Sequence, residues 1–141
     1  MSRWGDLLAA LEAVVRAATT SPAALPSGAD GWERVIRPPD RLHPGQFPHV
    51  FSDVVIEDAA TLAHAQRRVS TRILLHLWTQ GETLAQLEAR VDAIEAALLA
   101  DNTLGGIVRD VAIVTKGISD ATSTGDAKRC AVLILEAWRV L

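Results

Sequence analysis

A run of alternating residues, Val69-Ser70-Thr71-Arg72-Ile73-Leu74-Leu75-His76-Leu77-Trp78, decides the fold of this chain. Successive side chains of a β-strand point to opposite faces of the sheet, so every second residue shares a face. The alternation predicts a long strand with one dry face. That face carries Val69, Thr71, Ile73, Leu75 and Leu77, and the opposite face carries Ser70, Arg72, Leu74, His76 and Trp78.

The segment that follows this strand predicts an amphipathic helix with a defined start. Thr83 and Gln86 form a capping-box pattern, in which each side chain satisfies an otherwise unpaired amide of the first turn. The apolar stripe covers about two heptads, whereas a coiled coil needs about three or four, so we expect a helix packed on a sheet. The stripe consists of Leu84, Leu87, Val91, Ile94 and Leu98, and the other faces carry Glu82, Gln86, Glu88, Arg90, Asp92 and Glu95.

The beginning of the chain, from Ser2 to about Thr19, predicts a second amphipathic helix, because its apolar residues recur at helical spacing. Ser2 suits the N-cap, and Asp6 and Arg16 suit the first and last turns, where the helix dipole favours their charges. The apolar positions are Trp4, Leu7, Leu8, Leu11, Val14, Val15 and Ala18.

Four further segments have the composition of strands. Trp32–Arg37 is a short candidate that stops at two prolines, which cannot donate to a β-ladder. Val50–Glu57 is rich in β-branched residues, and Ile107–Lys116 suits a strand with both faces partly covered. Ala127–Leu141 alternates as expected for a central strand.

The remaining segments read as connections. Thr20–Asp30 and the proline-rich stretch Pro38–Pro48 predict loops, the second of them extended along the surface. Asp58–Gln66 predicts a turn or a short helix, and Gly117–Gly125 predicts a polar connection between the last two strands. Asp101–Gly106 predicts a turn whose glycines allow positive φ.

These elements together predict an α+β fold in the order α-β-β-β-α-β-β. We expect one domain over residues 1–141, with a mostly antiparallel sheet of about four to five strands and two main helices packed on it. The chain has 141 residues, of which 49% are apolar, and this composition suits a folded domain rather than a disordered segment.

Charge and cysteine content exclude several classes of protein. The 14 basic and 17 acidic side chains give a net charge of −3, which argues against a dedicated nucleic-acid binder. One cysteine, Cys130, rules out a disulfide framework within the chain and argues against a cysteine zinc site. The N-terminal segment lacks a signal-peptide pattern, and the longest apolar run, Cys130–Leu135, is far shorter than a membrane span. We expect a soluble protein.

Residues that could carry catalysis or hold a cofactor are not arranged for either purpose. The four histidines, His43, His49, His64 and His76, have no partner at helical spacing, so we expect solvated loop or surface side chains rather than metal ligands. Cys130 lies in an apolar run, which raises a thiol pKa and makes a poor nucleophile. Phosphate-binding and nucleophile-elbow motifs are missing from the sequence, and we expect no enzyme and no cofactor.

Arginine and tryptophan are distributed unevenly. Twelve of the 14 basic residues are arginines, and the two lysines are Lys116 and Lys128. Arginine and tryptophan are enriched at interaction hot spots, and core tryptophans beside a solvated charged face explain the pattern equally well. The clusters are Arg34, Arg37 and Arg41, then Arg67, Arg68 and Arg72, with Trp32 and Trp78 at strand positions.

The layout of the chain resembles the tail terminator family of long-tailed bacteriophages, including the minor tail protein U-like group and related tail-completion proteins. The resemblance runs over nearly the whole chain. It comprises the opening helix, the proline-rich loop that enters a strand at Phe47-Pro48-His49-Val50-Phe51, the long strand after Arg67-Arg68, the helix that ends at Leu98-Leu99-Ala100-Asp101, the turn Asn102-Thr103-Leu104-Gly105-Gly106-Ile107-Val108 and two closing strands.

This resemblance implies a small α+β protein that assembles, generally as a hexameric ring, on the last ring of the tail tube. Such a ring stops tube polymerisation and presents a surface to head-completion or connector proteins. The implied partners are copies of the chain, the tail tube protein and the head-completion protein, without direct nucleic-acid readout or a membrane. The implied location is the head-tail interface of the virion tail, assembled in the bacterial cytoplasm, and no catalytic residue or cofactor is implied.

Two exposed polar segments, Arg37–His49 and Gly117–Gly125, are the expected places of contact with neighbouring subunits or the tube. The candidate interface residues are Arg37, Arg41, His43, Arg67, Arg68, Lys116, Ser119, Asp120, Thr122 and Ser123.

Three other functions stay open at this stage. A head-tail connector or other neck component would have a similar size. A small-molecule-binding regulatory α+β module would enclose an apolar pocket between sheet and helix. A hydrolase or transferase is the third alternative, although its motifs are missing.

Overall fold

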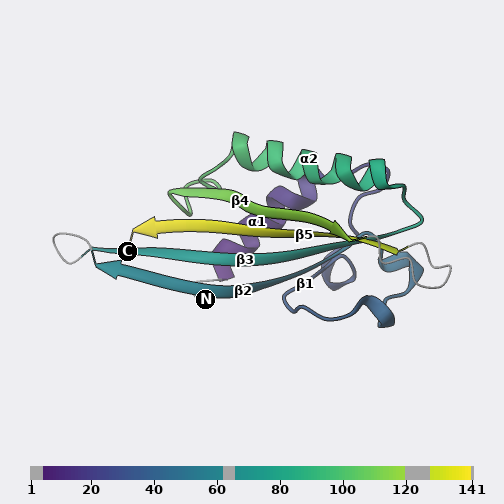
Figure 1. Ribbon diagram of the computed structural model, residues 1–141, viewed down its shortest axis with the longest axis horizontal. Helices are drawn as coiled ribbons and strands as arrows, with labels where there is room; N and C mark the ends of the chain where they lie inside the picture. Colours follow the sequence, from purple (N-terminus) through teal and green to yellow (C-terminus); the bar gives the residue numbers. More distant parts are fainter. Residues whose placement is uncertain (1–4, 62–65, 120–127, 141) are drawn as a thin grey trace.

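The computed structural model describes residues 5–61, 66–119 and 128–140, in which two α-helices and five strands follow the predicted order (Figure 1). The α+β class and the order α-β-β-β-α-β-β are therefore confirmed. The elements are α1 (Gly5–Ala18), β1 (Trp32–Glu33), β2 (His49–Thr61), β3 (Arg67–Gln80), α2 (Leu84–Ala100), β4 (Asp110–Ser119) and β5 (Lys128–Val140).

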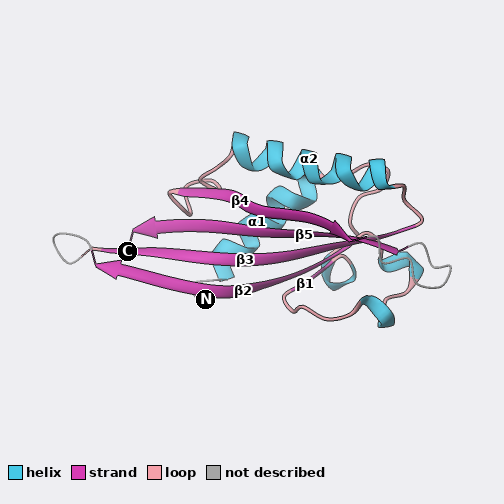
Figure 2. Cartoon of the chain, in the orientation of Figure 1, coloured by secondary structure: helices cyan, strands magenta, loops and turns pink. Residues whose placement is uncertain are grey.

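The strands form one sheet in the order β1-β2-β3-β5-β4 (Figure 2). The short β1 pairs parallel with β2, and all other neighbours are antiparallel. β5 lies between β3 and β4, which confirms that the last strand is central. β3 and β5 pair without interruption from Arg68↔Val140 to Gln80↔Lys128, so this pair forms the middle of the sheet.

The predicted dry face of β3 is the side of the sheet that the helices cover. Ile73 and Leu75 lie opposite Leu135 and Leu133 of β5, and all four are at most 1% exposed. In Figure 1, α2 runs along β4 while α1 lies behind the sheet, and both helices contribute to one apolar core. That core includes Leu7, Leu8, Leu11 and Val15 from α1, and Leu87, Val91, Ile94 and Leu98 from α2.

Local signals at the ends of α2 act as predicted. The Gln86 N–H donates to the Thr83 side chain over 3.2 Å, and the Thr83 N–H donates to Gln86 Oε1 over 2.8 Å. After the helix, Leu104, Gly105 and Gly106 have φ values of 50°, 70° and 91°. The capping box and the positive-φ turn are thereby confirmed.

Two predicted strands have different lengths in the structure. β1 covers only Trp32 and Glu33 of the predicted Trp32–Arg37, because the chain leaves the sheet once these two residues have paired with β2. β2 continues past Glu57 to Thr61, where a turn or a short helix was predicted, because its second half pairs with the start of β3. Cross-strand pairing thus outweighs the low strand propensity of Asp58-Ala59-Ala60.

Two further segments have a different structure from the one predicted. The Pro38–Pro48 stretch is not uniformly extended, since it contains 3-10 turns at Pro39–Arg41 and Pro44–Gln46, each with proline at its first position. Ile107–Lys116 was predicted to be a strand with both faces partly covered, and its second half is more exposed than that prediction implies. The strand is β4, which begins at Asp110, forms an edge of the sheet and is exposed from Val114 to Ser119.

Arg90, which the sequence pattern places outside the apolar stripe of α2, is nevertheless buried in the structure. The residue is 1% exposed. Its Nε and Nη2 donate to the two carboxylate oxygens of Glu82, each over 2.8 Å. Nη1 donates to Thr19 Oγ1 over 2.6 Å, and Nη2 also donates to the Ala23 carbonyl over 2.8 Å. The buried cation is stable there because an anion and two neutral acceptors surround it.

Replacing Arg90 tests this network. Arg90→Ala leaves the Glu82 carboxylate and two acceptors without their donor, so we expect it to lower the free energy of unfolding by about 3–5 kcal/mol. The matched control is Arg72→Ala, because Arg72 is 54% exposed and pairs with Glu136 over 3.4 Å. Loss of this exposed ion pair is expected to lower the free energy of unfolding by less than about 1 kcal/mol. Urea unfolding measures the free energy of unfolding of both variants. Equal losses of stability would contradict the conclusion that Arg90 forms a buried, stabilising network.

Candidate interaction surfaces

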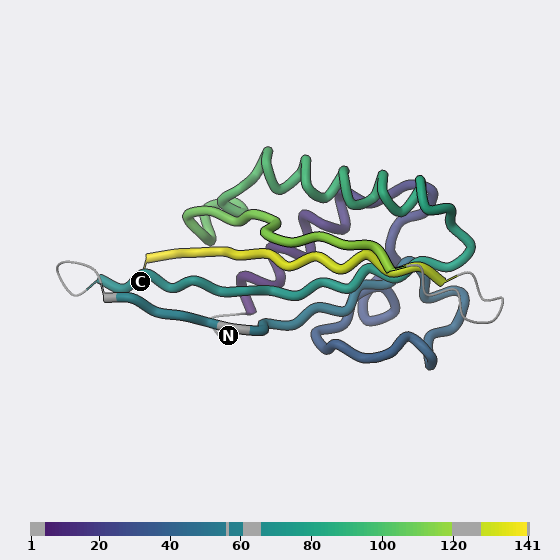
Figure 3. The backbone as a smooth tube through the Cα atoms, in the orientation of Figure 1, coloured from purple at the N-terminus to yellow at the C-terminus, as the bar shows by residue number. Residues whose placement is uncertain are grey.

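The predicted contact residues lie at opposite ends of the sheet rather than in one patch. Arg67 and Arg68 begin β3 at the "hairpin end", opposite the last residues of β2. Arg37, Arg41, His43 and Ser119 belong to the "loop end", where β2 begins and β3 and β4 finish. Figure 3 shows that these strand ends lie at the same end of the sheet. The two ends are separated by the length of β3, roughly 40 Å. Asp120, Thr122 and Ser123 lie outside the described residues.

At the hairpin end, two arginines are in different environments. The Arg68 guanidinium carbon lies 4.5 Å from the centroid of the Trp138 ring on β5, a distance suited to a cation–π contact. Arg67 is exposed at the first position of β3. The hairpin end therefore offers one arginine held against the sheet and one directed to solvent.

At the loop end, Glu33 of β1 contacts the side chains of Arg37 and His49. Arg37 Nη2 lies 2.7 Å from Glu33 Oε1, and its guanidinium carbon is 5.9 Å from the centroid of the Phe51 ring. His49 Nδ1 donates to the Asp30 carbonyl over 2.6 Å, while its Nε2 lies 3.1 Å from the same Glu33 oxygen. His49 is fully buried, so the prediction of a solvated histidine is wrong at this position.

Arg41 and His43 remain exposed on the proline-rich loop. Arg41 lines a surface hollow of about 340 Å³ together with Arg37, Pro38 and Asp40. The loop is fastened behind these residues, because the His43 N–H donates to Gln46 Oε1 over 2.7 Å. Gln46 Nε2 in turn donates to Asp30 Oδ1 over 3.2 Å. The two predicted contact residues are thus presented by an anchored loop.

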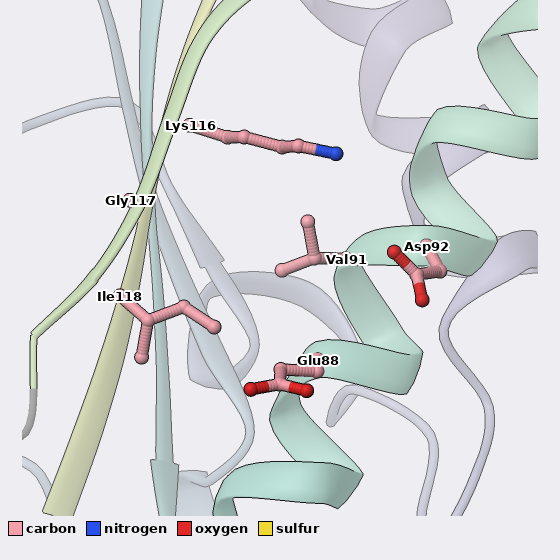
Figure 4. A pocket seen from close by; sticks show the side chains of 6 residues that line it. All are labelled: Glu88, Val91, Asp92, Lys116, Gly117 and Ile118. Carbon is pink, nitrogen blue, oxygen red and sulfur yellow. The ribbon is translucent and has the colours of Figure 1, made fainter.

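Lys116 belongs to a third place, the groove between α2 and β4 (Figure 4). Its Nζ donates to both carboxylate oxygens of Glu95, over 3.2 and 3.3 Å. The groove has a volume of about 350 Å³ and runs along the exposed part of β4. It is lined by Glu88, Val91, Asp92, Lys116, Gly117 and Ile118.

Two side chains away from these surfaces have pKa values that burial shifts. Burial lowers the pKa of His76 and raises the pKa of the Cys130 thiol to about 12. Within residues 5–61, 66–119 and 128–140, no three histidine, cysteine or acidic side chains are grouped as metal ligands. The two helices in that part of the chain are too short or too polar to cross a membrane.

Sequence reasoning missed the burial of Arg90 and of His49. Arg90 follows Glu82 by eight positions, but its other acceptors come from residues 67 and 71 positions away. The position of His49 depends on Asp30, 19 residues earlier. Glu82 just before the capped helix is the one local signal that could have indicated a partner for Arg90.

Comparisons with known proteins assign no family. No protein-family model and no curated protein matches the chain. One matching solved structure is a chain of the "Virion of native gene transfer agent (GTA) particle", with 14% sequence identity and a TM-score of 0.49. The match covers 96% of this chain and 90% of that chain. A likeness this distant establishes neither a shared fold nor a shared function.

The environment of Cys130 predicts slow thiol chemistry. With a pKa of about 12, the thiolate is a very small fraction at pH 8, so we expect maleimide to modify the folded protein slowly and the unfolded protein rapidly. A matched control is Ser119→Cys in a Cys130→Ala background, because Ser119 pairs with Cys130 across the ladder and is exposed. The control should react quickly. Equal rates for Cys130 in the native protein and for the control would contradict the expectation.

Proposed function

We propose that this chain is a structural protein of a phage-like tail, which caps the end of the tail tube as a ring and forms the surface that joins the head. The resemblance of the sequence to tail terminators suggests this role. The observation that carries it is the separation of two polar ends by a long sheet. A ring subunit between tube and head must contact different partners on opposite sides, and the two ends provide such surfaces.

The composition of the two ends suits protein contacts. Arg41 and His43 project from a loop that side-chain hydrogen bonds hold in place, so little loop ordering is needed on binding. Arg67 lies beside Arg68, whose packing against Trp138 limits its freedom. Arginine pairs well with carboxylates at such joints because its planar guanidinium offers two parallel donors.

The alternative of a ligand-binding module receives less support from the geometry. That function requires an enclosed apolar pocket. The groove beside β4 is lined by three charged side chains, and Lys116 crosses it toward Glu95. Its chemistry favours a macromolecular contact over a small apolar ligand.

Capping of a growing tube tests the proposal directly. The purified chain is added to polymerising tail-tube subunits of the same particle, and the products are imaged by electron microscopy. We expect tubes that stop growing and carry a ring at one end. Tubes that continue to grow, with no ring at either end, would overturn the proposed function.

A gene deletion separates this role from that of a connector. If the chain terminates the tube, particles without it should have overlong tubes that lack heads. Tails of normal length that fail to join heads would instead indicate a head-tail connector.

Charge reversal at the two ends is expected to weaken assembly without unfolding the chain. Arg41→Glu and Arg67→Glu change exposed residues at the loop end and the hairpin end, respectively. Each should reduce binding to the partner that its end contacts, the tube for one variant and the head for the other, in co-sedimentation, while circular dichroism and the unfolding midpoint stay unchanged. The controls Arg41→Lys and Arg67→Lys keep the charge and should assemble. Unaltered assembly of both reversal variants would refute the placement of contacts at these ends.

A further inference from the structure

In the described part of the chain, the two outer edges of the sheet lack a paired strand along most of their length. Among the described strands, β4 pairs with β5 on its inner side and with none on its outer side. β2 pairs with β1 only at Val50 and Phe51, so no strand in the described part of the chain pairs with its outer edge from Asp53 to Thr61. Open strand edges present main-chain donors and acceptors that can pair with another chain.

Apolar side chains are exposed on both of these edges. Val55 is 55% exposed at the bulge of β2, and Val114 is 49% exposed at the bulge of β4. Ile118, also on β4, is 38% exposed. Proteins usually protect an open edge with proline or several charges, yet residues 111–119 contain no proline and one charged residue, Lys116.

The β2 and β4 edges differ in charge, and this difference disfavours the pairing of one β2 edge with another β2 edge. Residues 49–61 contain Asp53, Glu57 and Asp58 but no lysine or arginine, so two β2 edges placed together would bring acidic rows close to each other. Residues 111–119 contain no acidic residue. A β2 edge therefore meets less repulsion from a β4 edge than from another β2 edge.

Strand direction makes the unlike edges compatible. The antiparallel steps from β2 to β3, to β5 and to β4 leave β2 and β4 running in opposite directions. A second copy in the same orientation, placed beside the first, would thus bring its β2 antiparallel to β4. Such a contact uses two different surfaces of the chain, and repeated contacts of this kind close into a ring when the rotation between copies allows it.

We propose that the β4 edge of one copy pairs with the β2 edge of the next, so that the sheet continues from subunit to subunit. The occupant of the open edge is a second copy of this chain, and the inference rests on the proposed ring. The groove of about 350 Å³ beside β4 leaves space under α2 for side chains of the added strand. The lateral contacts then use the edges, and the hairpin and loop ends stay free for the tube and the head.

Cross-linking tests which edges meet. Cys130→Ala removes the one native thiol, and Val55→Cys and Val114→Cys are then made singly and together. A short bismaleimide is applied to concentrated protein and to tubes incubated with the protein, since its reach tolerates a small register offset. We expect a ladder of cross-linked multimers for the double variant and mainly monomer for each single variant.

The outcomes separate this inference from the proposed function. Rings on tubes without a ladder would overturn the edge pairing and leave the capping role intact. A ladder without tube capping would support the pairing and overturn that role. Efficient dimers from a single variant would show that equal edges meet, and the absence of both rings and ladder would overturn both proposals.

A substitution that changes the charge of the β4 edge provides a second test, which does not depend on the distance between two thiols. Val114→Glu adds an acidic side chain to the edge of β4, which would then face the acidic β2 edge of the next copy, so we expect the dissociation constant of the multimer to rise about tenfold or more. The matched control is Ala13→Glu, because Ala13 is exposed on α1, which belongs to neither edge. Sedimentation velocity and ring formation on tubes should be unchanged for the control. Equal association of Val114→Glu and the parent chain would refute the pairing.

Discussion

The guanidinium group of Arg90 joins three segments that the rest of the structure needs in fixed positions. It lies on α2, binds both carboxylate oxygens of Glu82 just before that helix, and reaches Thr19 and Ala23 just after α1. Arg129 at the start of β5 also donates to the Glu82 carbonyl over 3.2 Å. These hydrogen bonds therefore connect α2 to the segment that follows α1, and connect the residue before α2 to the sheet. A buried cation gives such a joint directional preference, which apolar packing alone lacks.

The architecture could be predicted to the extent that it depends on local periodicity. The alternation in β3 identified its buried face, and the spacing of Leu87, Val91, Ile94 and Leu98 identified the buried face of α2. Leu84, the first residue of the predicted stripe, is 42% exposed. The capping box located the start of that helix. Each of these signals acts over a few residues, so the sequence contains it in full.

The errors arose where distant residues determine the structure. The length of β2 depends on its pairing with β3, and the burial of His49 depends on Asp30 and Glu33. The pattern placed Arg90 outside the apolar stripe of α2 but gave no sign of its burial, because its acceptors on Thr19 and Ala23 lie far away in the sequence. The sequence suggested the candidate contact residues. Their division between the two ends of the sheet could be seen only once the pairing of the strands was known.

The central place of β5 has a consequence for how the chain acquires its fold. β5 is synthesised after the other four described strands, yet it lies between β3 and β4. Until it arrives, the β2–β3 hairpin has an apolar face and an open inner edge, and β4 has no neighbour to pair with. Sheet completion depends on contacts between residues as far apart as Arg68 and Val140, which makes folding slow relative to helical proteins of this size. The nascent chain is therefore most prone to aggregation just before its last strand leaves the ribosome.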